Sequence, residues 1–78
     1  MENKLSINIL VREEEMDGEK VIIVNNEETG ISDFGDTLDE AISNFRKSMS
    51  MFLEEYPEKR ELLIQKENKP LLISKIFL

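Results

Sequence analysis

The chain has 78 residues, with 17 acidic and 10 basic side chains and a formal net charge of −7. It contains neither cysteine nor histidine, which excludes disulfide bonds, thiolate metal sites and any catalysis in which this chain supplies a cysteine or a histidine. No apolar run approaches the roughly 20 residues of a membrane span, and the start of the chain lacks the apolar region of a signal peptide. We therefore expect one cytoplasmic domain over residues 1–78.

The first part of the chain predicts a β-hairpin. Apolar and polar residues alternate over residues 5–11, which is the period of a half-buried strand. Asp17 and Gly18 indicate a tight hairpin turn, because both central residues of a type I′ turn need a positive φ. Residues 21–24 are all β-branched and predict a second strand with apolar side chains on both faces.

A turn, a third strand and a helix are predicted next. Residues 25–30 contain turn-forming Asn, Thr and Gly, and residues 31–34 predict a short strand. Thr37 and Glu40 have the spacing of a capping box, which indicates the start of a helix. The helix then carries one continuous apolar stripe: Leu38, Ala41, Ile42, Phe45, Met49, Phe52, Leu53 and Tyr56.

The last part of the chain completes an α+β fold. Pro57 either ends the helix or begins a short second one over residues 58–64, and after a loop at residues 67–70 a final strand is predicted over residues 71–78. This is a β-β-β-α-β sheet with one main helix packed on one face. If each element reverses direction, the final strand is parallel to the first or the third strand, with a right-handed crossover.

The second face of this sheet is a candidate surface for self-association. One helix cannot cover both faces of a four-stranded sheet, and an exposed apolar sheet face usually binds a partner. We therefore expect a homodimer or a higher oligomer. The alternative is that the exposed apolar residues are scattered singly and carry no function. The candidate oligomer face consists of Leu10, Ile22, Val24, Leu72 and Ile76.

The negative charge is concentrated in the middle of the chain. Residues 13–40 hold eleven acidic residues and one basic residue, Lys20, a net charge of −10. Such a segment repels nucleic acid and attracts a basic protein, although an acidic surface can also serve solubility alone. The hairpin tip and the helix start should lie at the same end of the sheet. The candidate partner-facing acids are Glu13, Glu14, Glu15, Asp17, Asp36 and Asp39.

Candidate catalytic chemistry is sparse. Asp33, Asp36 and Asp39 recur every third residue, but a strand or turn position explains the first, and favourable charge at a helix start explains the other two. A metal-dependent nuclease of the ribonuclease H type needs acids on adjacent central strands, and residues 5–11 contain none. We therefore expect no catalytic residue, no metal site and no cofactor.

Residues 29–41, Thr-Gly-Ile-Ser-Asp-Phe-Gly-Asp-Thr-Leu-Asp-Glu-Ala, resemble the HicB-like family of type II antitoxins, in which a glycine, a short strand and Gly-Asp-Thr-x-x-Glu-Ala open an amphipathic helix. The resemblance implies a partial ribonuclease H-like fold with strand order 3-2-1-4, here without a DNA-binding extension. It also implies homo-oligomers and an antitoxin that neutralises a small basic ribonuclease toxin, HicA, by covering its active site. An alternative is an orphan HicB-like subunit, structural or regulatory, that has no toxin.

Overall fold

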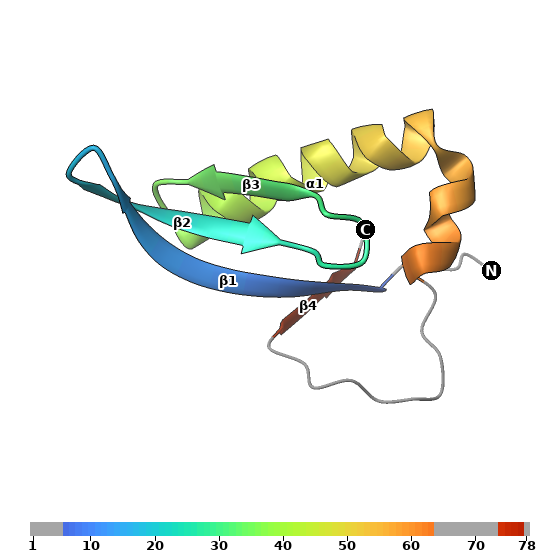
Figure 1. Ribbon diagram of the computed structural model, residues 1–78, viewed down its shortest axis with the longest axis horizontal. Helices are drawn as coiled ribbons and strands as arrows, with labels where there is room; N and C mark the ends of the chain where they lie inside the picture. Colours follow the sequence, from blue (N-terminus) through green and yellow to red (C-terminus); the bar gives the residue numbers. More distant parts are fainter. Residues whose placement is uncertain (1–5, 64–73, 78) are drawn as a thin grey trace.

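The computed structural model describes residues 6–63 and 74–77. The chain forms an α+β structure in which four strands, in the order β3-β2-β1-β4, make one antiparallel sheet. One main helix, α1, accompanies the sheet, as Figure 1 shows, and the predicted order of elements is confirmed. The elements are β1 (Ser6–Met16), β2 (Glu19–Asn25), β3 (Ser32–Gly35), α1 (Leu38–Glu55), the 3-10 helix η1 (Pro57–Leu63) and β4 (Ser74–Phe77).

A two-residue turn joins β1 to β2. Asp17 has φ = 53° and Gly18 has φ = 81°, so both central residues lie in the left-handed region, as the hairpin signal predicts. Met16 pairs with Glu19, and the ladder continues to the pair of Leu10 with Asn25. β1 therefore extends beyond the predicted residues 5–11, because a ladder of backbone hydrogen bonds can form between strands whose side chains are charged.

Asn26 organises the turn between β2 and β3. Its side chain is fully buried, and its Nδ2 atom donates hydrogen bonds to the carbonyl of Asn8 and to Glu28 Oε1, each at 2.8 Å. Its Oδ1 atom accepts from the backbone N–H of Thr29 at 2.8 Å and from the hydroxyl of Thr29 at 2.7 Å. Gly30, at φ = 77°, donates its N–H to the Asn26 carbonyl. The buried amide thus ties the turn to β1 without leaving its own polar groups unpaired.

The junction between β3 and α1 has the predicted capping residues. Thr37 accepts from the Glu40 N–H at 3.1 Å, while Glu40 Oε1 accepts from the N–H of Asp36 at 2.8 Å, one residue earlier than in the usual capping box. Gly35 lies against the first turn of the helix. A Cβ atom at this position would come within 2.6 Å of the backbone nitrogen of Ala41, so the close approach of strand and helix requires glycine.

The core lies between α1 and one face of the sheet. The middle of the predicted stripe is buried there, whereas Leu38 and Tyr56 at its ends are 46% and 48% exposed. With 18 residues and a length of about 27 Å, α1 is longer than β3, so the ends of the stripe receive less cover. Met51 is 68% exposed, as its position off the stripe predicts. The buried core residues are Ile7, Ile9, Val24, Ala41, Phe45, Met49, Leu53, Leu63 and Ile76.

The direction of the last strand differs from the prediction. β4 is antiparallel to β1, with Ser74 opposite Ile9 and Phe77 opposite Ser6, so the predicted parallel strand and right-handed crossover are wrong. The assumption that each element runs opposite to the preceding one applies only when the helix leads directly into the strand. Here η1 and residues 64–73 intervene, and a connection of that length can reach either end of a neighbouring strand. The predicted loop at residues 67–70 lies outside the described residues.

Candidate interaction surfaces

The acidic hairpin tip and the helix start lie at the same end of the sheet. Glu13 pairs with Ile22, and Ile22 pairs with Gly35, so these three residues form one row across β1, β2 and β3. β1 and β3 run in the same direction because both are antiparallel to β2. The chain that follows Glu13 and the chain that follows Gly35 therefore leave the sheet at the same end, which Figure 1 shows on the left.

We call this region the acidic end. Arg12 Nε lies 2.7 Å from Glu14 Oε2, and Lys20 Nζ lies 4.0 Å from Glu13 Oε1. These side chains are about half exposed or more, so the two ion pairs contribute little stability. The negative potential of the other exposed carboxylates extends about one screening length, roughly 8 Å, into the solvent. The acidic end comprises Glu13, Glu14, Glu15, Asp17, Glu19, Asp36, Asp39 and Glu40, all of them exposed.

Asp33 has a structural role between β3 and α1. Its Oδ1 atom accepts from the backbone N–H of Phe34 at 2.8 Å, and its Oδ2 atom accepts from the Ser48 hydroxyl at 2.5 Å. The Asn44 side chain donates to the carbonyl of Phe34 at 2.8 Å. Sequence reasoning missed Asn44 and Ser48, although their separation by four residues places them on one side of the helix. Together these contacts occupy both backbone polar groups of Phe34.

Within residues 6–63 and 74–77, no three acidic side chains come close enough together to hold a metal ion. Asp36 and Asp39 lie at the start of α1, as the sequence predicts, whereas Asp33 faces Ser48 of the same helix. The three carboxylates therefore contribute negative charge to this part of the protein.

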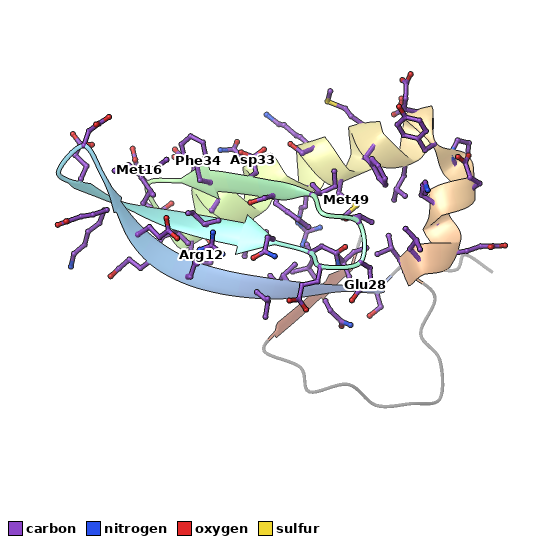
Figure 2. The ribbon with its side chains drawn as sticks, viewed as in Figure 1. Arg12, Met16, Glu28, Asp33, Phe34 and Met49 are labelled. Carbon is purple, nitrogen blue, oxygen red and sulfur yellow. The ribbon has the colours of Figure 1, made fainter. Side chains whose placement is uncertain are left out.

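The sheet face opposite α1, which we call the second sheet face, carries apolar side chains. Arg12, Ile23 and Phe34 form a row across β1, β2 and β3 on this face. Ile23 is only 8% exposed because it lies between the other two, whereas Phe34 is 51% exposed. Figure 2 labels Arg12 on β1 and Phe34 on β3. The other members of the face on these strands are Ser6, Asn8, Leu10, Glu14, Met16, Glu19, Val21, Asn25 and Ser32.

The sequence-based assignment of the candidate oligomer face was wrong for three residues. Val24 and Ile76 are buried in the core beneath α1, and Ile22 packs against that core. Leu10 lies on the second sheet face as expected, and Leu72 is outside the described residues. The two-residue turn was the missed signal. It pairs Met16 with Glu19, which places Val24 opposite the core-facing Val11 and turns Val21 and Ile23 to the other side.

The end of the second sheet face nearest β4 is polar. Ser6 and Asn8 lie there on β1, and Asn25 lies opposite Leu10 on β2. Ser6 Oγ, Asn8 Oδ1 and Asn25 Oδ1 are buried without a hydrogen-bond partner. The exposed large apolar side chains of this face, Met16 and Phe34, lie toward the hairpin.

No protein-family model, no curated protein and no solved structure matches the chain. Across its described residues, the chain has no helix with both the length and the apolar character needed to cross a bilayer.

Proposed function

We propose that this protein is an antitoxin-type interaction module that binds and neutralises a small basic ribonuclease toxin of the HicA type. The observation that carries the proposal is the acidic end, where the hairpin tip and the helix start bring their carboxylates to one end of the sheet. A basic protein is attracted to such a surface over several ångströms, whereas the phosphates of nucleic acid are repelled.

The proposal includes a partial ribonuclease H-like fold of the HicB type. The strand order β3-β2-β1-β4 is the order that the resemblance implies. Residues 29–41, which carry the resemblance, span β3, the close approach at Gly35 and the capped start of α1. The antiparallel direction of β4 is a difference from the parallel arrangement expected from the sequence.

Neutralisation by this surface needs apolar contact as well as charge. Charges at the rim of an interface mainly raise the association rate, while buried apolar anchors supply most of the affinity. The acidic end has two exposed apolar side chains, one on each side of the sheet: Leu38 in the first turn of α1 is 46% exposed, and Met16 on the second sheet face is 45% exposed. Docking of these residues beside the catalytic groups of a basic ribonuclease would exclude RNA from its active site.

The test compares two charge-reversed variants with equal changes in net charge. In the first, Glu13→Lys, Glu15→Lys and Glu19→Lys alter the acidic end. In the control, Glu54→Lys, Glu55→Lys and Glu58→Lys alter exposed positions at the end of α1 and the start of η1. We expect the first variant to bind a HicA-like ribonuclease roughly tenfold more slowly at low salt, in stopped-flow measurements, and the control to bind near the wild-type rate.

High salt should bring the rates of the two variants together, because screening removes long-range attraction. Equal rates for both variants at low salt would remove the acidic end from the binding surface. If the wild-type protein neither binds nor inhibits the ribonuclease, the antitoxin proposal fails. The exposed Phe34 then favours the alternative, a self-associating subunit that has no toxin.

A further inference from the structure

We infer that the basic partner adds an extended segment as a strand along the outer edge of β1 at the hairpin tip. The described residues of β4 pair with Ser6 to Ile9, whereas β1 continues to Met16. Among residues 6–63 and 74–77, no strand lies beside the later part of β1 on this edge, which Figure 1 shows extending to the left of β4. We call the outer edge from Glu13 to Met16 the open edge. The identity of the partner rests on the proposed function, and the mode of binding rests on the geometry of the sheet.

The register of the hairpin shows which backbone groups face the open edge. The residues that flank a two-residue turn bond each other, and here they are Met16 and Glu19. Bonded and outward-facing pairs then alternate along an antiparallel ladder. The N–H and C=O groups of Glu13 and Glu15 therefore point away from β2, toward the open edge. An added strand can bond these groups without disturbing the hairpin.

The opposite edge of the sheet, at β3, is closed to such a strand. The same alternation, continued through the register to β3, turns the N–H and C=O of Phe34 away from β2. Asp33 accepts from this N–H and Asn44 donates to this C=O, each at 2.8 Å. A partner strand cannot pair with β3 here without breaking these bonds. Within the described part of the chain, no such bond closes the backbone of Glu13 or Glu15.

The side chains along the open edge select a basic strand. Glu13 and Glu15 lie on one face of β1 and Glu14 on the other. On the β2 side, Lys20 lies opposite Glu15 with its Nζ 4.0 Å from Glu13 Oε1, an exposed pair that neutralises little of this charge. Lysine or arginine residues of an added strand would lie directly opposite the glutamates and stabilise the pairing. Pairing this edge with the same edge of a second copy places glutamates opposite glutamates, which disfavours self-association here.

The first test removes one backbone donor and keeps every charge. In the full chain made by chemical synthesis, backbone N-methylation of Glu15 should weaken binding of a HicA-like ribonuclease roughly tenfold, because it removes an outward-facing N–H. N-methylation of Lys20 is the matched control: Lys20 lies opposite Glu15, and its N–H faces the other side of the hairpin. Equal affinities of the two variants for a ribonuclease that the wild type binds would overturn strand addition and leave the antitoxin proposal standing. Circular dichroism checks that each variant is folded.

The second test does not depend on a toxin. A short synthetic peptide of alternating lysine and threonine, at about 1 mM, is added to the wild-type chain, and NMR follows the backbone amides. We expect the amides of Glu13 and Glu15 to shift and to exchange more slowly with solvent, the amide of Glu14 to respond less, and an alternating glutamate and threonine peptide to have no effect.

The two tests separate the inference from the proposed function. If the basic peptide binds in this way and the ribonuclease does not bind, the antitoxin proposal fails and strand addition by a basic segment stands. If the amides of Glu13 and Glu15 respond to neither the peptide nor the ribonuclease, the inference is wrong.

Discussion

The two faces of the same sheet differ in what buries their apolar residues. On the face beneath α1, Ile7, Ile9 and Val24 are at most 1% exposed because a helix covers them. On the second sheet face, Ile23 is nearly buried by neighbours within the sheet, while Phe34 is half exposed. Successive residues of one strand therefore have different surroundings: those beneath the helix pack in the core, and those opposite pack only against their neighbours within the described part of the sheet.

The largest expected effect comes from comparing two phenylalanines. Phe45 is fully buried beneath the sheet, so Phe45→Ala should lower the free energy of unfolding by about 3–5 kcal/mol. Phe34 is half exposed, so Phe34→Ala should cost about 1 kcal/mol or less. Urea denaturation followed by circular dichroism measures both. Equal losses would mean that the two faces contribute alike to stability.

A smaller effect is expected where the helix approaches the sheet most closely. Gly35→Ala would place a Cβ atom 2.6 Å from the backbone nitrogen of Ala41, and backbone cannot yield as a flexible side chain can. The helix must shift, at a cost of about 1–3 kcal/mol in the free energy of unfolding. Thermal unfolding of this variant measures the loss. Gly18→Ala is not a suitable control, because the positive φ of Gly18 adds strain of its own; Ser50→Ala, on the exposed side of α1, is suitable.

The smallest of these effects concerns the cap of α1. Thr37→Ala removes the acceptor of the Glu40 N–H and should lower the free energy of unfolding by about 1 kcal/mol. The lost stability belongs to the helix, which covers the opposite face of the sheet. The NMR chemical shifts of Phe34 on the second sheet face should therefore change little. A stability equal to that of the wild type would show that Glu40, which accepts from Asp36, is sufficient to hold the helix start.

Much of the molecule could be predicted from residues that are close in sequence. Asp17 and Gly18 indicated the hairpin, and the acids around them and after Gly35 were correctly expected to share one end of the sheet. The choice of outward-facing residues on β2 was wrong although the necessary signal was present. A two-residue turn fixes the register of its strands, and the register assigns Ile22 and Val24 to the core.

The sequence by itself determined the elements, the turn between β1 and β2, the cap of α1 and the negative charge of residues 13–40, because each depends on residues a few positions apart. Only the tertiary structure decided the direction of β4, the closing of the β3 edge by Asn44 and the burial of the Asn26 amide against β1. Those features join residues far apart in the chain, and many pairings of such residues are compatible with the same local pattern. Among these pairings, the chain adopts the one that buries the apolar side chains and also satisfies the polar groups.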